Sequence, residues 1–513
     1  MAWYAPTKDK KQRTKMSGIK SLAKDTAVYG MSSIVGRFLN WCLVPLYTHV
    51  FTQAEYGVVT YLYSLVALLL IILTYGMETG FFRFANHEKY SDPMRVYTTG
   101  LISLAVSSVA FLLAVWIFLD PISSVLGSSG DPRYVMMLAV TLAIDAFTSL
   151  PFAYLRYKQR PLRFAGIKLL SIFLNIGLNL FFIVLCPLLQ QSHPGWISWF
   201  YRPDFGVGYI FLSNLVASAV TLLVLFPEVA GVRYRFDAEI WRRMIVYSFP
   251  LLIMGLAGIM NQTIDKLIYP WLVADPDRAM AELGVYGANY KIAIVMVMFI
   301  QAFRFAYEPF VFAKSRSRGE ESQKAYVDAM HYFIIFGLLI FLGVMFYLPV
   351  LKYFISPRYF SGLAVVPVVM AGELFFGIFF NLSLWYKLTD RTYWGTIFSL
   401  FGLAVTLLIN ILFVPRYGYM ACAWAAFFCY LSMMVASYAV GRKYYPVPYK
   451  WGAAFRYLLL AAVLYAAAMY VPIAHTGALL AFRTVLLALF VVYAVKKDLP
   501  LAELPFVGRF FRR

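Results

Sequence analysis

The sequence predicts an all-α polytopic membrane protein of about 14 transmembrane helices, in two six-helix lobes followed by two further helices. The 513-residue chain is 62% hydrophobic, its mean hydropathy is +0.70, and only 14% of its residues are charged. A soluble domain carries about 25% charged residues. Apolar runs of about 20 residues, the length that crosses the roughly 30 Å hydrocarbon core, recur along the chain. Lysine and arginine gather in alternate connections between these runs.

The apolar runs define the predicted spans, and the ten-residue alternating segments of a membrane β-barrel are absent. In chain order the spans are expected at 25–49, 56–80, 96–119, 134–155, 164–187, 208–228, 244–272, 285–312, 330–350, 362–386, 394–415, 420–440, 454–472 and 478–495. They divide the chain into a basic tail (1–24), an N-lobe (25–228), an amphipathic cytoplasmic linker (229–243), a C-lobe (244–440), spans 13 and 14 (454–495) and a second tail (496–513).

A short internal repeat supports the two lobes. Tyr56-Gly57 at the start of span 2 and Tyr286-Gly287 at the start of span 8 are 230 residues apart. Aromatic-glycine turns also precede spans 6 and 12. Six spans separate the members of each pair, so the repeat is parallel, as in transporters whose halves enclose a substrate site.

Positive charge predicts the orientation of the spans. The net charge is +20, and 33 of the 45 lysines and arginines fall in the two tails and in the loops after even-numbered spans. The opposite loops hold 6, and the remaining 6 lie within spans. By the positive-inside rule both termini are cytoplasmic. Because the charge follows membrane topology, nucleic acid is not an expected partner.

Eleven ionisable residues lie inside predicted spans, where a charge at the bilayer centre costs about 2.5–3.5 kcal/mol. Such residues usually face a polar cavity or a counter-charge, so the function is expected in the interior of the protein. The cations are Arg37, Lys168, Lys266, Lys291, Arg304 and Arg483, and the acids are Glu78, Asp145, Asp265, Glu308 and Glu373.

Arg37 is the leading cavity residue, because it is a cation near the middle of span 1, and Ser33 and Asn40 share its helical face. Guanidinium groups suit phosphate, since their fork of donors matches two oxygens and they stay charged. Acids at mid-membrane depth either bind a coupling ion, Na⁺ or H⁺, or pair with the cations. The expected substrate-binding residues are Arg37, Asn40, Arg304, Lys291, Lys168 and Asn261, and the expected coupling or charge-pairing residues are Asp265, Glu308, Asp145, Glu373 and Glu78.

Simpler interpretations of these charges stay open. Arg304 and Glu308, four residues apart, also fit an intrahelical ion pair, and Asp265 with Lys266 also fits pairing with neighbours near the outer interface. Lys168, Lys291 and Arg483 lie close enough to span ends to extend to the interface, and for Arg483 this is the favoured interpretation.

No enzyme signature is present in the sequence. There is no phosphate-binding P-loop, so ATP is not the expected energy source, and the five histidines are dispersed without metal-ligand spacing. Catalytic residues, a metal site and a cofactor are therefore not expected.

The layout resembles the polysaccharide-transporter branch, which includes the O-antigen flippases, of the multidrug/oligosaccharidyl-lipid/polysaccharide (MOP) flippase superfamily. The resemblance rests on fourteen spans, a central arginine in span 1, a repeat after six spans, the NQTIDK run at 261–266, and the opening segment with PLYT at 45–48 and FTQAEYG at 51–57. It covers roughly residues 18–440, and spans 13 and 14 look like an extra pair that some members carry.

The resemblance implies two lobes that open alternately to either side of a bacterial inner membrane, with both termini cytoplasmic. It implies a cargo of lipid-linked (polyprenyl-pyrophosphate) oligosaccharide, moved to the outer leaflet for cell-surface polysaccharide such as lipopolysaccharide O-antigen. Arg37 and Arg304 would hold the phosphates. Expected partners are the cargo, membrane lipids and polysaccharide polymerase or assembly proteins, and a monomer suffices.

Three alternatives remain at this stage. A cation-coupled multidrug extruder of the same superfamily would favour acids in its cavity, and the basic residues within spans outnumber the acidic ones only by six to five. A lipid II flippase differs only in cargo. An integral-membrane glycan polymerase or ligase usually needs a large outer loop with catalytic residues, and the longest outer loop here has about 20 residues and one acid, Asp204.

Overall fold

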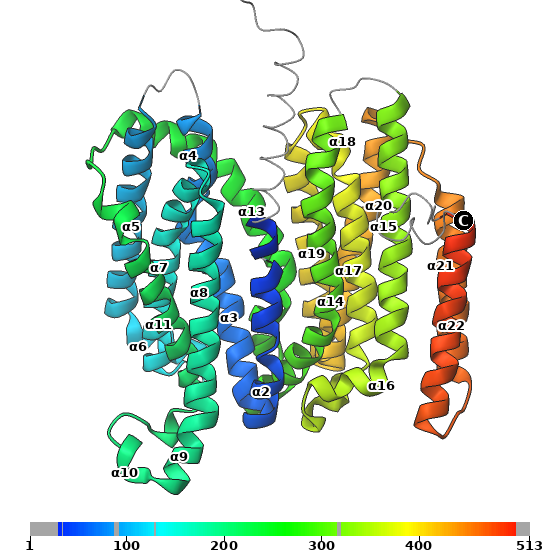
Figure 1. Ribbon diagram of the computed structural model, residues 1–513, viewed down its shortest axis with the longest axis horizontal. Helices are drawn as coiled ribbons and strands as arrows, with labels where there is room; N and C mark the ends of the chain where they lie inside the picture. Colours follow the sequence, from blue (N-terminus) through cyan, green and yellow to red (C-terminus); the bar gives the residue numbers. More distant parts are fainter. Residues whose placement is uncertain (1–28, 33, 87–91, 128–129, 315–319, 499–513) are drawn as a thin grey trace, which may run out of the picture. The chain divides into compact units, whose positions relative to one another are not determined.

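The computed structural model describes residues 29–32, 34–86, 92–127, 130–314 and 320–498, apart from the side chains of 306, 308–314 and 320–322. The described residues form helices and turns without a β-strand. The helices form two compact units, Met1–Thr263 and Ile264–Arg513, and within each unit they run side by side (Figure 1). The predicted tail 1–24 and most of the predicted tail 496–513 lie outside the described residues.

The described part of unit 1 begins with a helix over residues 29–41, of which residue 33 is not described. This helix is interrupted just before Pro45, whose ring removes a backbone N–H and disfavours a continuous helix. The following helices are α2 (Val44–Val50), α3 (Gln53–Thr74), α4 (Met77–Ala85), α5 (Pro93–Ile117), α6 (Leu119–Leu126), α7 (Pro132–Tyr157), α8 (Pro161–Leu180), a π-helical turn (Phe181–Leu185), α9 (Cys186–Ser192), α10 (Pro194–Ile197), α11 (Gly208–Val224), α12 (Phe226–Ala230) and α13 (Ala238–Leu272), whose end belongs to unit 2.

In its described residues, unit 2 continues from α13 with nine further α-helices. They are α14 (Pro276–Lys314), α15 (Glu320–Phe346), α16 (Leu348–Leu351), α17 (Val365–Leu382), α18 (Leu384–Leu388), α19 (Tyr393–Tyr417), α20 (Tyr419–Tyr444), α21 (Trp451–Tyr470) and α22 (Thr476–Lys497).

The helices confirm the predicted fold class. Within the described residues, 12 helical segments are long and apolar enough to cross a membrane. Gly208–Val224 is a shorter apolar helix, and the first predicted span is only partly described. With these two, the segments correspond to the fourteen spans expected from the sequence.

Aspartate-proline pairs begin several of the long helices. Asp92 accepts hydrogen bonds from the backbone N–H groups at the start of α5, and Asp131 accepts one at the start of α7. Asp275 does the same at the start of α14. The aspartate satisfies N–H groups that lack an intrahelical partner, and proline at the first helical position has no N–H to satisfy.

The division between the units falls inside α13, whereas the sequence analysis placed it in a linker at 229–243. Residues 231–237 form a turn and irregular backbone, and α13 already begins at Ala238. Ile240 and Met244 are buried in the core of unit 1, and the Ser248 hydroxyl donates a 3.1 Å hydrogen bond to the Gly76 carbonyl. These contacts assign the first part of α13, up to Thr263, to unit 1.

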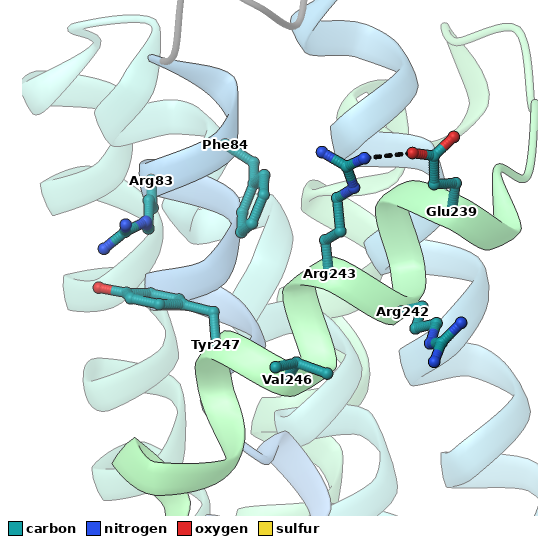
Figure 2. A pocket seen from close by; sticks show the side chains of 7 residues that line it. All are labelled: Arg83, Phe84, Glu239, Arg242, Arg243, Val246 and Tyr247. Carbon is teal, nitrogen blue, oxygen red and sulfur yellow. Dashed lines mark hydrogen bonds and ion pairs between the residues drawn. The ribbon is translucent and has the colours of Figure 1, made fainter.

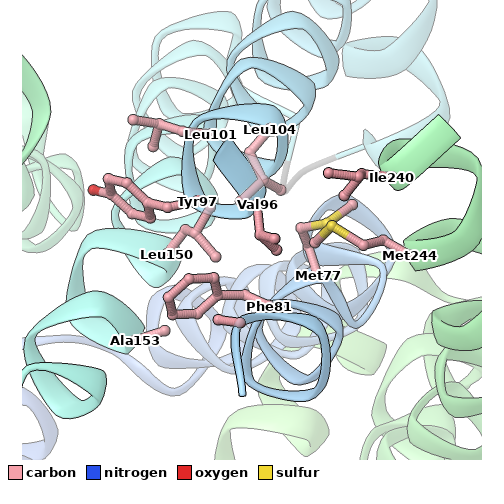
Figure 3. Close-up of a cluster of buried hydrophobic side chains, with 11 residues drawn as sticks. Met77, Phe81, Val96, Tyr97, Leu101, Leu104, Leu150, Ala153, Ile240 and Met244 are labelled. Carbon is pink, nitrogen blue, oxygen red and sulfur yellow. The ribbon is translucent and has the colours of Figure 1, made fainter. Parts of the chain in front are cut away.

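A cluster of buried apolar side chains holds α4, α5, α7 and the start of α13 together (Figure 3). Between membrane helices, such a cluster stabilises the contact through van der Waals packing. The cluster contains Met77, Phe81, Ala85, Val96, Tyr97, Leu101, Leu104, Leu150, Ala153, Ile240 and Met244.

Close helix packing characterises unit 2. At Gly372 in α17, an added Cβ would lie 3.1 Å from the Cα of Phe427 in α20, so the absence of a side chain lets the two backbones approach. A second buried cluster lies beside this contact and joins α17, α19 and α20 through Phe379, Phe398 and Tyr430. Small residues at helix contacts are typical of membrane helix bundles.

Candidate functional site

A polar cavity of about 790 Å³ lies within unit 1. Its walls come from the helix over residues 29–41 and from α3, α4, α7, α8 and α11. The structure brings together in this cavity five of the residues predicted from the sequence, namely Arg37, Asn40, Glu78, Asp145 and Lys168.

Helix α7 contributes one continuous face to the cavity. Asp145, Thr148, Ser149, Phe152 and Arg156 are spaced 3, 4, 7 and 11 residues from the first of them, so they lie on one side of the helix. All five line the cavity. The sequence analysis assigned Arg156 to a loop and missed it, although its spacing from Asp145 carried the signal.

Arg156 and Glu78 form an ion pair in the cavity wall. The guanidinium carbon of Arg156 also lies 5.2 Å from the centroid of the Phe82 ring and 5.8 Å from that of Phe164. Glu78 was predicted as a coupling or charge-pairing residue, and in the structure it pairs with this cation.

Asp145 and Lys168 occupy the same cavity without an ion pair between them. The Ser218 hydroxyl donates a 2.7 Å hydrogen bond to Asp145 Oδ1. Lys168 Nζ lies 4.0 Å from the centroid of the Phe152 ring. The cavity thus holds three cations against two acids, and among the described lining residues Asp145 is the carboxylate that forms no ion pair.

Arg37 is positioned by a close approach between the first helix and α8. A Cβ at the neighbouring Gly36 would lie 2.6 Å from Cδ1 of Ile172 in α8, so glycine allows this contact. The Arg37 side chain is exposed to the cavity. Ser33, expected on the same face, lies outside the described residues.

Asparagine side chains connect the first helices to α8. Asn175 donates a 3.3 Å hydrogen bond to Asn40 Oδ1, and Asn179 donates a 2.8 Å bond to the Asn175 carbonyl. The Tyr47 hydroxyl donates a 2.9 Å bond to Asn179 Oδ1. Asn40 is therefore part of a polar chain that fixes the cavity wall as well as a lining residue.

Unit 2 holds a second group of predicted residues in a buried network. Lys266 Nζ lies 3.1 Å from Asp265 Oδ1, and the Tyr286 hydroxyl donates a 2.7 Å hydrogen bond to Asp265 Oδ2. The Tyr290 hydroxyl donates a 2.7 Å bond to Glu373 Oε1. Lys266 Nζ also lies 4.7 Å from the ring centroid of Tyr290, the partner of Glu373. Lys266 therefore contacts Asp265 directly and Glu373 through Tyr290. The sequence analysis missed the two tyrosines that satisfy these carboxylates.

The remaining predicted residues lie outside these two groups. The guanidinium carbon of Arg304 lies 4.2 Å from the Phe380 ring centroid in unit 2. Lys291 is half-buried and follows Tyr290 on α14, and Asn261 is buried in α13. Glu308 belongs to α14, and its side chain lies outside the described part of the chain, so the predicted pairing with Arg304 stays a prediction.

The interpretation of Arg483 as a side chain that extends to the interface is wrong. Its side chain is buried and donates to two backbone carbonyls, at 3.1 Å to Phe346 and at 3.1 and 3.3 Å to Ala468. Phe346 ends α15, and Ala468 lies in the last turn of α21. The last carbonyls of a helix lack intrahelical partners and carry partial negative charge, which explains why the guanidinium is held there.

Metal ligation is not indicated by the described residues. Among them, no group of three or more histidine, cysteine, aspartate or glutamate side chains is placed to hold a metal ion. The polar cavity is lined by more cations than acids, together with hydroxyls, amides and some apolar side chains, and its cations, hydroxyls and amides suit an anionic or sugar-like ligand.

Comparison with known proteins identifies a family and a fold. Residues 22–307 match the model of a family described as polysaccharide biosynthesis protein. A structure of the lipid II flippase MurJ in an inward closed conformation matches with a TM-score of 0.70 at 11% identity, covering 92% of this chain and 98% of that chain. A comparison with curated protein sequences gives no match.

Transporters of a second kind share the fold. An inward-facing multidrug resistance MATE family transporter of the MOP superfamily matches with a TM-score of 0.65 at 14% identity, covering 82% of this chain and 97% of that chain. An outward-facing MATE structure of the same superfamily matches with a TM-score of 0.51 at 14% identity, over 82% and 95% of the two chains. At these identities the likeness establishes the fold alone.

Proposed function

The chain belongs to the polysaccharide biosynthesis protein family, whose model matches more than half of its length, and on this premise we propose that it is a lipid-linked oligosaccharide flippase. The cargo is a repeat unit on polyprenyl pyrophosphate, moved by alternating access from the cytoplasmic to the outer leaflet of a bacterial inner membrane. The family match and the shared fold support the resemblance to the MOP superfamily that the sequence indicated.

The charge of the cavity in unit 1 is the observation that carries this proposal. A pyrophosphate-sugar headgroup is anionic and rich in hydroxyls, and it cannot cross hydrocarbon without a polar path. The lining supplies Arg37 and Lys168 for phosphate oxygens, with hydroxyls and amides for sugars. Glu78 is paired with Arg156, so the lining keeps a net positive charge.

Asp145 has a separate role in this proposal. It is the acid of the described lining that forms no ion pair, and it is held by the Ser218 hydroxyl. We assign Asp145 to coupling by Na⁺ or H⁺. Binding of either ion would neutralise its carboxylate and so change the charge that faces Arg37 and Lys168. The buried acids of unit 2, Asp265 and Glu373, are the second group of coupling residues in the proposal.

The two rival transport functions differ in cargo charge. A multidrug extruder takes mostly cationic compounds, and a cavity with more cations than acids opposes them. A lipid II flippase takes a cargo of the same chemistry, so the cavity alone does not separate it from an oligosaccharide flippase. Cargo assays in cells are needed to distinguish these functions.

The test is complementation of a strain that lacks this gene with the Arg37→Gln variant. A hydrogen bond to a charged group contributes about 1.5–3 kcal/mol, so its loss in the transport step should lower surface glycan at least about tenfold. Arg160→Gln is the matched control, because Arg160 is exposed and does not line the cavity. Immunoblotting of membranes checks that both variant proteins are present at equal levels.

The lipid-linked intermediates decide between functions. Loss of surface glycan, with complete repeat units trapped on the cytoplasmic leaflet, supports the flippase. Short polymers with units that still reach the outer leaflet indicate a polymerase, and accumulation of lipid II indicates the lipid II flippase. Sensitivity to cationic drugs with normal glycan indicates an extruder. Full complementation by Arg37→Gln would remove Arg37 from the mechanism.

A further inference from the structure

A groove of about 610 Å³ lies at one end of unit 1, apart from the polar cavity. We call it the arginine groove. Arg83 and Phe84 reach it from the end of α4, and the other lining residues come from the first turns of α13 (Figure 2). These are Glu239, Arg242, Arg243, Val246 and Tyr247.

The arginine groove carries positive charge that the described carboxylates do not balance. Arg243 forms an ion pair with Glu239. Arg83 and Arg242 are exposed, and neither pairs with a carboxylate of the described residues. The guanidinium carbon of Arg83 lies 4.2 Å from the Tyr247 ring centroid. The ring therefore holds the guanidinium group in place, and the N–H groups of Arg83 stay available to a ligand. Each of the Arg83 and Arg242 guanidinium groups, which lie at opposite edges of the groove in Figure 2, is thus available to an anion.

An exposed apolar stripe continues from the arginine groove along α13. Arg242, Val246, Phe249 and Ile253 are spaced 4, 7 and 11 residues from the first, so they lie on one face of the helix. The exposed fractions of the three apolar residues are 68%, 56% and 38%. One helical face therefore passes from a cation to apolar side chains, which matches a ligand with an anionic head and an apolar tail.

The groove lies where a lipid headgroup is expected. Arg83 is in the last turn of α4, and Arg242 is in the second turn of α13, a 35-residue helix that is long enough to cross the membrane. Trp241 is 38% exposed beside the groove, and tryptophan and tyrosine concentrate at membrane interfaces. Basic pockets between membrane helices are known to bind anionic lipid headgroups.

We propose that the arginine groove binds an anionic glycerophospholipid, with its phosphate on Arg242 and an acyl chain along Val246, Phe249 and Ile253, while Arg83 adds positive charge at the opposite edge of the groove (Figure 2). This site is separate from the cavity that we assign to transport, and the inference does not depend on the cargo. A soluble phosphate would contact only the arginines, whereas a lipid would also contact the apolar stripe.

The experiment is native mass spectrometry of the purified full chain in detergent, with phosphatidylglycerol or phosphatidylcholine added. Each arginine near an anionic lipid surface strengthens binding about fivefold. Wild-type protein should therefore retain phosphatidylglycerol at least about fivefold better than phosphatidylcholine, and Arg83→Gln/Arg242→Gln should lose most of this preference. The control variant Arg160→Gln/Arg233→Gln removes the same charge from exposed positions outside the groove, and it should keep the preference for phosphatidylglycerol.

A second variant separates a lipid from a free phosphate. Val246→Gln/Phe249→Gln keeps both arginines and should lower retention of phosphatidylglycerol, and glycerol phosphate in excess should not displace the lipid from wild-type protein. The proposal fails if the groove variant keeps the wild-type preference, if the control variant loses it equally, or if glycerol phosphate displaces the lipid. Thermal unfolding of each variant checks that it is folded.

Discussion

Lys266 and Asp265 are neighbours in the chain, and both side chains are buried in unit 2. Their charges lie 3.1 Å apart, and the Tyr286 hydroxyl donates to the same carboxylate. Taking two charges out of water is costly, and a buried ion pair offsets that cost only with good geometry and further hydrogen bonds. Tyr286 and the neighbouring Tyr290 ring supply these additional contacts.

The Lys266→Met variant should therefore be much less stable than the wild type, because it leaves Asp265 buried without its cation. Breaking a buried pair by removing one partner costs about 3–5 kcal/mol. The Asp265→Asn/Lys266→Met variant removes both charges, so its free energy of unfolding should fall less than that of Lys266→Met alone. Unfolding of the purified variants in detergent measures both changes in free energy.

Lys443→Met serves as the control for this pair of variants, since Lys443 is exposed near the end of α20. Surface substitutions of this kind change the free energy of unfolding by no more than about 0.5 kcal/mol. A double variant less stable than Lys266→Met would contradict the view that an unpaired buried carboxylate causes the loss.

Helical spacing predicted part of the cavity at the residue scale. It grouped Arg37 with Asn40, and the occurrence of Glu78, Asp145 and Lys168 inside predicted spans marked them as candidate interior residues. Spacing alone does not reveal which helices meet, so the Glu78–Arg156 pair and the Ser218–Asp145 hydrogen bond were missed. Such contacts join residues 73 and 78 positions apart, and only the folded chain brings them together.

At the scale of elements, Arg483 connects three helices of unit 2. Its guanidinium on α22 donates to carbonyls at the ends of α15 and α21. Hydropathy placed α21 and α22 correctly as an additional pair of helices, and it gave no information about how they attach. The position of Arg483 near a span end suggested the lipid interface, but the ends of neighbouring helices lie at the same depth and compete for the guanidinium.

The Arg483→Met variant should loosen the C-terminal pair of helices. Hydrogen bonds to a charged group contribute about 1.5–3 kcal/mol each, so we expect a loss of at least about 2 kcal/mol in the free energy of unfolding. Limited proteolysis between α21 and α22, at residues 471–475, should be faster than in the wild type. Arg456→Met, which removes an exposed arginine from α21, is the control. Equal resistance of both variants to protease would show that Arg483 does not hold these helices.

At the scale of the whole molecule, fold class and span number followed from apolar runs and from the alternation of positive charge. The boundary between the units did not follow, because α13 continues from one unit into the other and no loop marks the division. The element that most directly tests the predicted topology is α11, which has 17 residues. At 1.5 Å per residue it extends about 26 Å, less than the roughly 30 Å hydrocarbon core.

Helix α12 follows α11 after one residue, so residues 208–230 supply enough helix for a crossing. We therefore expect Asp204 and Arg233, on either side of this segment, to lie on opposite faces of the membrane. In a Cys42→Ser background, a membrane-impermeant maleimide should label Asp204→Cys in spheroplasts and should reach Arg233→Cys only after permeabilisation. The other native cysteines, Cys186, Cys422 and Cys429, are buried and should stay unlabelled. Labelling of both positions from outside would mean that residues 208–230 do not span the membrane, whereas the reverse pattern would place the positively charged loops and both termini outside.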